Sequence, residues 1–258
     1  MSASIDRVRA FLRAVEDGVC DETRPACCGT ALLTPSLPLV WSLNALRVED
    51  PDVGPDAVMD EAERLLSAYG HRRLIVHDEA VATALAPALA DRGWSVDRLL
   101  AMELTRPPQR DVAAGLASEA ERAVGAAALA AFRREQPFGW QEEAVRQLAE
   151  MDGRYTRAAA ARDFVAPTER PAAACRLYVH GPTAQVDEVG TIESERGHGY
   201  ASAAVVAAVR AALADGKDFV FLLTNAADWP QQLYRRLGFD PVGSVYEFLK
   251  LPLGSARP

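Results

Sequence analysis

The sequence predicts an α/β protein in which helices flank a mixed, strongly twisted sheet, arranged as two related units. Three observations lead to this class. Strand-like runs alternate with helical periodicities along the chain. Residues 184–214 read as a strand, a glycine-containing turn and a helix rich in small residues. A unit of strand, helix, glycine–aromatic pair and strand occurs twice, 145 positions apart.

The composition is typical of a soluble globular chain with room for one large domain or two ordinary ones. Of 258 residues, 49% are hydrophobic and 25% charged, with a net charge of −8. This acidic balance argues against a nucleic-acid partner and allows a cationic acceptor. Neither a long apolar run nor a signal-peptide core is present, so we expect a cytoplasmic protein without a membrane partner. A homodimer is compatible with the sequence.

The four cysteines indicate no metal site. They are Cys20, Cys27, Cys28 and Cys175, and their spacing matches no zinc signature. We interpret them as reduced structural thiols, in preference to a redox or metal-binding role. The prediction is a protein without a metal.

In the first half, apolar periodicity predicts helices where residues recur at three and four positions, and strands where apolar runs are bounded by turn residues. The expected helices are 4–17, 57–69 and 80–91, and the expected strands are 29–33, 40–48, 74–77 and 99–104. Residues 105–110 contain two prolines and are the predicted linker.

In the second half, the same criteria predict two helices, three successive strands, and then a strand between two helices. The expected elements are helices 119–135 and 140–151, strands 158–166, 172–180 and 184–192, helix 200–214, strand 219–223, and a short helix that Asp228 caps. Residues 136–140 lie between the first two helices and are either an acceptor-facing loop or ordinary loop packing.

The turn Arg196-Gly197-His198-Gly199-Tyr200-Ala201 predicts a site for a phosphate. It stands between a strand and a helix, and the first amides of a helix have no partner within it. These amides and the helix dipole both favour an anion. The spacing of the glycines fits neither the dinucleotide-binding fingerprint nor the P-loop.

A second motif, Leu233-Tyr234-Arg235-Arg236-Leu237-Gly238-Phe239, follows after an intervening strand. The two motifs, in this order, resemble the pyrophosphate loop and the Leu-Tyr-x-x-Leu-Gly-Phe signature of the GCN5-related N-acetyltransferase (GNAT) family. The resemblance covers roughly residues 110–251. It implies the acyl-CoA N-acyltransferase fold, acetyl-CoA as co-substrate, and transfer of acetyl to a primary amine of a small molecule or a protein.

The resemblance also implies which residues would hold the cofactor. The Arg196 side chain and the backbone of Gly197, His198, Gly199, Tyr200 and Ala201 would bind the pyrophosphate. The pantetheine arm would pair with the backbone edge of Val189, Gly190 and Thr191, beside a splayed neighbouring strand. Asn225, at the end of that neighbour, would cap the pantetheine amides.

Tyr234 matches the tyrosine that lies near the thioester sulfur in the family, and a phenol is a suitable proton donor to a leaving thiolate. The alternative is an aromatic residue of the core. For the base, the chain departs from the family pattern, because Gln185 stands where many relatives carry a glutamate. Glu188 is the predicted base, with a chain of waters as the alternative.

The repeated unit predicts that residues 1–106 form a degenerate GNAT-like domain and residues 110–258 the catalytic domain. No phosphate turn precedes the first copy, and Leu89 stands where Tyr234 stands in the second. A chance likeness between two strand–helix–strand units is the alternative. Two other functions also stay open, namely a non-catalytic acyl-CoA sensor and an enzyme that transfers longer acyl groups.

Overall fold

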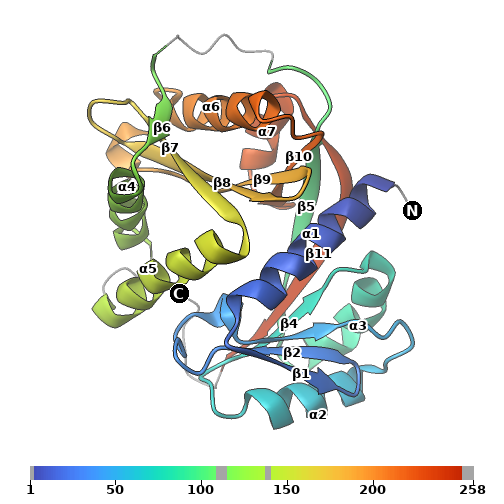
Figure 1. The fold of residues 1–258 in the computed structure, drawn as a ribbon. Coiled ribbons are helices and arrows are strands. Elements are labelled where there is room, and N and C mark those ends of the chain that lie inside the picture. Colours follow the sequence, from blue (N-terminus) through green and yellow to red (C-terminus); the bar gives the residue numbers. More distant parts are fainter. Residues whose placement is uncertain (1–2, 109–114, 137–140, 252–258) are drawn as a thin grey trace. The chain divides into compact units, whose positions relative to one another are not determined.

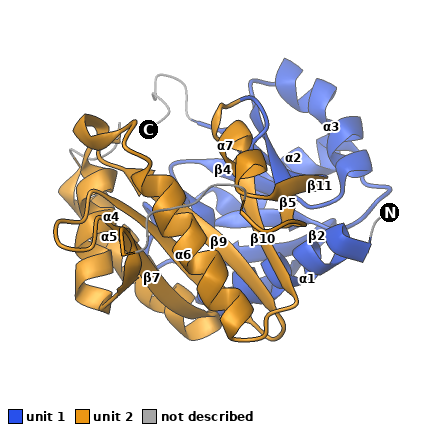
Figure 2. Ribbon diagram, turned by 90° about the horizontal axis from the view of Figure 1, so that it is seen from above, with its two compact units in different colours: residues 1–101, 225–227, 243–258 blue, residues 102–224, 228–242 orange. Residues whose placement is uncertain are grey.

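The computed structural model describes residues 3–108, 115–136 and 141–251. Contacts divide the chain into two compact units, coloured separately in Figure 2. The first holds the described residues within 1–101, 225–227 and 243–258, and the second those within 102–224 and 228–242. Two strands run from one unit into the other: β5 (Ser95–Leu104) and β11 (Phe239–Lys250).

The first unit is a sheet with helices on both faces. Strand β2 pairs antiparallel with β1 and with β3, β3 pairs parallel with β4, and residues 246–250 of β11 pair antiparallel with β4. Its elements are α1 (Ala3–Val19), β1 (Glu22–Ala26), β2 (Gly29–Leu33), a 3-10 turn (Trp41–Leu43), β3 (Ala45–Val48), α2 (Pro55–Leu66), β4 (Arg72–Val76) and α3 (Glu79–Asp91).

Alternation along the strands separates the two faces of this sheet. Leu46 and Leu74 belong to the large core that α2 and α3 complete. Arg47 points the other way, toward α1, where its Nη1 atom lies 3.1 Å from an oxygen of Glu16. Each face is therefore covered by different helices.

The second unit repeats this layered plan. Strands β6 to β9 pair antiparallel in chain order, and β10 pairs parallel with β9. Figure 1 shows α6 on one side of these strands and α4 and α5 on the other. The elements are β6 (Ser118–Ala120), α4 (Arg122–Arg134), α5 (Glu142–Ala158), β7 (Ala160–Ala166), β8 (Ala173–His180), β9 (Thr183–Thr191), a 3-10 turn (Glu193–Glu195), α6 (Tyr200–Ala214), β10 (Phe219–Asn225) and α7 (Pro230–Arg236).

The sequence predicted the fold class correctly. The structure is α/β with a mixed sheet flanked by helices, residues 183–191 form a strand, and α6 has the predicted bounds 200–214. The two units also share an element order, since α1-β1-β2-β3-α2-β4-α3-β5 matches α5-β7-β8-β9-α6-β10-α7-β11 with the same pairing directions. The domain limits 1–106 and 110–258 stay a prediction, because compact units are not the same as independent folding units.

Several predicted elements were wrong in their bounds. Residues 118–120 are a strand paired with β7, so the helix expected from 119 begins at Arg122. The next helix continues to Ala158, beyond the expected end at 151. In the first half, residues 41–43 form a 3-10 turn inside the expected strand 40–48. Strand β1 was not predicted, because Pro25 and its charged neighbours do not resemble a buried strand.

Candidate active site

The site begins where two parallel strands diverge. Strand β9 pairs with β10 at Thr183, Ala184 and Gln185, and in the described residues this ladder ends there although both strands continue. On its other side β9 stays paired with β8, as far as Thr191. The edge of residues 186–191 that faces β10 is therefore open to another hydrogen-bonding chain.

A bulge shapes β9 at this point. Ala174 pairs with Gly190 and Arg176 with Asp187, so two residues of β9, Glu188 and Val189, stand opposite Cys175 alone. Glu188 has a φ of 54°, which is unusual for a residue other than glycine. The bulge breaks the alternation of side chains next to the open edge.

The turn after β9 presents backbone amides as the sequence predicted. Gly197 and Gly199 have φ values of 85° and 82°, and a Cβ on either would meet no atom within 4 Å. Gly199 is the N-cap of α6, and its carbonyl accepts the first helical hydrogen bond, from the Ala203 amide at 3.0 Å. The amides of residues 200–202 therefore lie outside the helical ladder.

One cavity of about 550 Å³ joins the open edge, the glycine turn and helix α7. The sequence-predicted residues that line it are Val189, Gly190, Thr191, Arg196, Gly197, Gly199, Tyr200, Ala201 and Tyr234. A single space thus connects the glycine turn, the open edge of β9 and the phenol of Tyr234.

Tyr234 lies on α7 with its ring edge-on to Phe239, at a centroid distance of 6.3 Å. The side chain is buried, and burial raises the pKa of its phenol well above the usual value. The hydroxyl is therefore protonated at neutral pH. Among the residues that the structure describes, this hydroxyl makes no hydrogen bond, and Tyr234 lines the cavity.

Three predicted residues do not line this cavity. The carboxylate of Glu188 accepts a hydrogen bond of 2.7 Å from Arg133. The His198 ring stacks on Tyr200, with its Nδ1 3.1 Å from the Glu195 carbonyl. Asn225 belongs to the first unit, where it bonds Asp97 at 3.4 Å and the Ala227 amide at 2.8 Å. Their assigned roles stay predictions.

Asp228 was predicted to cap α7, and this was wrong. Its carboxylate accepts from the amide of Trp229, and the helix has no side-chain cap. The geometry instead leaves Asp228 and Trp229 lining the cavity, together with Leu233 and Arg236 of α7 and Phe132 of α4. Of these residues, Leu233 and Arg236 lie within the Leu-Tyr-x-x-Leu-Gly-Phe motif, Arg236 at one of its variable positions, and none of the five had a predicted role in this cavity.

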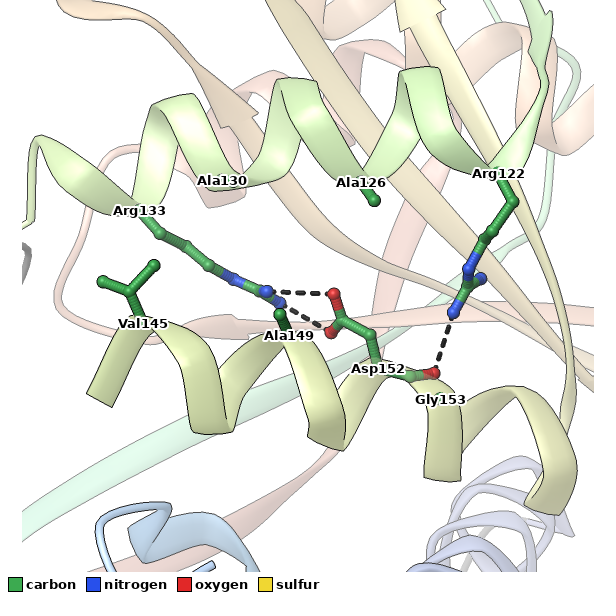
Figure 3. Close-up of a pocket in the computed structure, with 8 residues that line it drawn as sticks. All are labelled: Arg122, Ala126, Ala130, Arg133, Val145, Ala149, Asp152 and Gly153. Atoms are coloured by element: carbon green, nitrogen blue, oxygen red, sulfur yellow. Dashed lines mark hydrogen bonds and ion pairs between the residues drawn. The ribbon is translucent and has the colours of Figure 1, made fainter. Parts of the chain in front are cut away.

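Beside α4 lies a buried network of charges, part of which Figure 3 shows. Arg133 binds Asp152 through two hydrogen bonds of 3.0 and 2.9 Å, and Arg176 lies 2.9 Å from Asp152 and 2.6 Å from Asp163. A second cavity of about 180 Å³ lies between α4 and α5, lined by small residues and by Arg122, Arg133 and Asp152. The sequence did not predict these ion pairs, because the spacing of alanines along α4 and α5 does not show which charged side chains will be buried.

The predicted acceptor-facing loop at 136–140 lies almost wholly outside the described residues, as does the end of the linker 105–110. Within the residues described, no cluster of histidine, cysteine, aspartate and glutamate could hold a metal. The cysteines in this part of the chain are all free. None of the helices described is both long and apolar enough to span a membrane.

The diverging strands, the glycine turn and the buried phenol all lie in one segment of the chain, and the comparisons with known proteins identify that segment as part of an acyltransferase. The model of the acetyltransferase (GNAT) family matches residues 125–239, so the segment that carries these features belongs to that family. No curated protein sequence matches the chain.

Solved structures resemble the chain over most of its length. A GCN5-related N-acetyltransferase from Kribbella flavida is 21% identical with a TM-score of 0.67, over 98% of this chain and 97% of that one. A functionally unknown protein from Staphylococcus epidermidis is 16% identical with a TM-score of 0.66, over 89% and 93%. A tandem GNAT protein from the clavulanic acid biosynthesis pathway is 16% identical with a TM-score of 0.52, over 86% and 78%. At these identities the likeness shows the fold alone.

Proposed function

We propose that the protein is an acetyl-CoA-dependent N-acetyltransferase that moves an acetyl group to a primary amine by direct attack. The observation that carries the proposal is the continuous cavity. Its glycine turn suits a pyrophosphate, its open strand edge suits the amides of pantetheine, and Tyr234 lines the same space.

The reaction needs a bound thioester, a neutral attacking amine and a proton for the departing thiolate. The neutral amine attacks the thioester carbonyl, so a C–N bond forms, the C–S bond breaks, and coenzyme A leaves as a thiolate. The protonated phenol of Tyr234 is suited to give its proton to that thiolate. The proton lost by the amine then restores the phenol or passes to solvent.

The reaction also needs a base that takes a proton from the amine. Glu188 is our prediction, and its carboxylate is bound to Arg133 at 2.7 Å. Accepting a proton would require that contact to loosen, so a chain of waters from the amine to solvent stays as the alternative.

The amine belongs to a small molecule or a protein, and the net charge of −8 suits a cationic acceptor. A cytoplasmic location stays part of the proposal.

The second candidate is a non-catalytic acyl-CoA sensor. The engagement of Glu188 by Arg133 favours it, since a sensor needs the cofactor cavity but no available base. Both candidates predict that acetyl-CoA binds. They differ in whether an amine consumes it.

The decisive experiment has two stages. Calorimetry first measures whether the full chain binds acetyl-CoA. Mass spectrometry then follows a panel of small amines and peptides for a gain of one acetyl group, with release of free coenzyme A thiol as a second readout. Binding with acetylated product supports the enzyme, and binding without product over the whole panel supports the sensor. Failure to bind acetyl-CoA contradicts both.

A further inference from the structure

Phe132 occupies a position in the cofactor cavity that the family motifs do not mark. It lies on α4 and lines the same cavity as Tyr234 and the edge residues 189–191. A Cβ built on Gly190 would stand 2.6 Å from two atoms of the Phe132 ring. The ring therefore lies directly on the backbone of β9, in the space that any side chain at residue 190 would need.

Two contacts link the C-terminal end of α4, just after Phe132, to β9 and to the turn that follows β9. Arg133, the next residue, binds Glu188 of the bulge at 2.7 Å and Asp152 of α5 at 2.9 and 3.0 Å. Glu135 accepts a hydrogen bond of 2.9 Å from the amide of Glu193, just after the strand. The partners of these contacts, Glu188 and Glu193, lie on either side of Gly190 along the chain. The backbone next to Phe132 therefore cannot move away from β9 without breaking the ion pair between Arg133 and Glu188.

This arrangement places a fixed apolar wall next to the strand edge. The ring has no hydrogen-bonding group, so it can limit the size of what lies in the cavity but cannot orient a polar group. A short acyl group needs little room beside such a wall. Each further methylene would have to displace a ring that already lies against main-chain atoms, and close-packed interiors resist such insertion.

We propose that Phe132 sets the length of the acyl group that the site accepts, restricting it to short acyl chains. The inference rests on the proposed binding of acetyl-CoA and deepens it by naming the substrate class. Phe132 acts here as a specificity residue, with no part in proton transfer.

The test compares binding of acetyl-, butyryl- and hexanoyl-CoA by calorimetry, which needs no acceptor. For the wild-type chain we expect hexanoyl-CoA to bind at least about tenfold more weakly than acetyl-CoA, the low end of the discrimination that apolar packing gives against an added methylene. In Phe132→Ala the ratio should fall below about threefold, chiefly through tighter binding of hexanoyl-CoA. Phe132→Leu, which keeps apolar volume, should give an intermediate ratio and guards against loss of folding in the alanine variant.

Val124→Ala is the matched control, because Val124 is an exposed residue of α4 that does not line the cavity. It should keep the wild-type ratio. Equal binding of all three ligands by the wild type would overturn the proposal, as would a ratio unchanged in folded Phe132→Ala and Phe132→Leu. If the wild type binds none of the three, the proposed function fails first, and the two failures are thereby told apart.

Discussion

Arg133 and Glu188 join α4 to the bulge of β9 through a hydrogen bond of 2.7 Å, and Arg133 also holds Asp152. The side chains of Arg133 and Asp152 are both only 7% exposed. Removing the guanidinium takes two hydrogen bonds from a buried carboxylate and leaves Asp152 to share Arg176 with Asp163. We expect Arg133→Met to lower the free energy of unfolding by about 3–5 kcal/mol, measured by urea denaturation. Arg146→Met is the control, since it removes an exposed pair with Glu143 and should leave the free energy of unfolding nearly unchanged. Equal losses in the two variants would contradict the role of the buried pair.

The glycine turn is tested by replacing Gly199 with valine. The positive φ disfavours any side chain there, and the added atoms would enter the space that the phosphates need. We expect the dissociation constant of acetyl-CoA, measured by calorimetry, to rise at least about tenfold, a change of roughly 1.4 kcal/mol.

Gly216→Val is the control that separates the effect of backbone strain on stability from an effect on acetyl-CoA binding. Gly216 also has a positive φ, 72°, with no neighbour within 4 Å of a Cβ, but it does not line the cavity. This control should lose stability and keep the affinity for acetyl-CoA. The assignment of the turn fails if both variants bind as the wild type does.

Tyr234→Phe tests the proposed proton donor. The ring and its contact with Phe239 remain while the hydroxyl is removed. With any amine found to be acetylated, we expect kcat to fall roughly a hundredfold and the dissociation constant of acetyl-CoA to change little. Wild-type turnover in this variant would leave Tyr234 as a residue of the core.

The sequence predicted the parts of the site that depend on local chemistry. The glycines of the turn were predictable because positive φ and open amides require that residue, and α6 begins where the motif ends. The bulge was not, since apolar alternation across residues 184–192 does not show that Glu188 takes a positive φ. The partners of Phe132 and Arg133 were also hidden, because an alanine-rich helix does not reveal which strand it covers.

His71 should make stability depend on pH. Burial lowers the pKa of this histidine from 6.5 to about 4, partly opposed by its hydrogen bond with the Asn44 carbonyl. The folded state thus prefers the neutral ring, while the unfolded chain takes up a proton below about pH 6.5. The free energy of unfolding should therefore fall as the pH drops from about 6.5 to about 4, by up to roughly 3 kcal/mol.

Urea denaturation at pH 7.5 and pH 4.5 measures this effect. His71→Gln can still donate to the Asn44 carbonyl but has no charge to gain, so its loss of stability between the two pH values should be smaller than that of the wild type. His180→Gln, at an exposed strand end, should behave as the wild type. Parallel pH profiles for all three proteins would contradict the assignment to His71.

The first unit supplies the last prediction, which is that one chain binds one acetyl-CoA. Its helix α2 corresponds to α6 and begins at Pro55, after Gly54. We expected no glycine turn that presents free amides at the start of this helix, and the one glycine there, Gly54, lies in extended backbone. The copy still differs where binding would occur, because Gly54 has a φ of −80° where Gly199 has 82°.

Two further features of this helix start oppose an anion. Proline at the first helical position has no amide hydrogen, and Asp56 adds a negative charge to the first turn. In the place of Tyr234 the unit has Leu89, which is fully buried in its core and has no proton to donate. Calorimetric titration of the full chain should therefore saturate at one equivalent, and Gly199→Val should weaken the whole of that signal. A second equivalent of comparable affinity, or one that survives Gly199→Val, would show that the first unit has kept a working site.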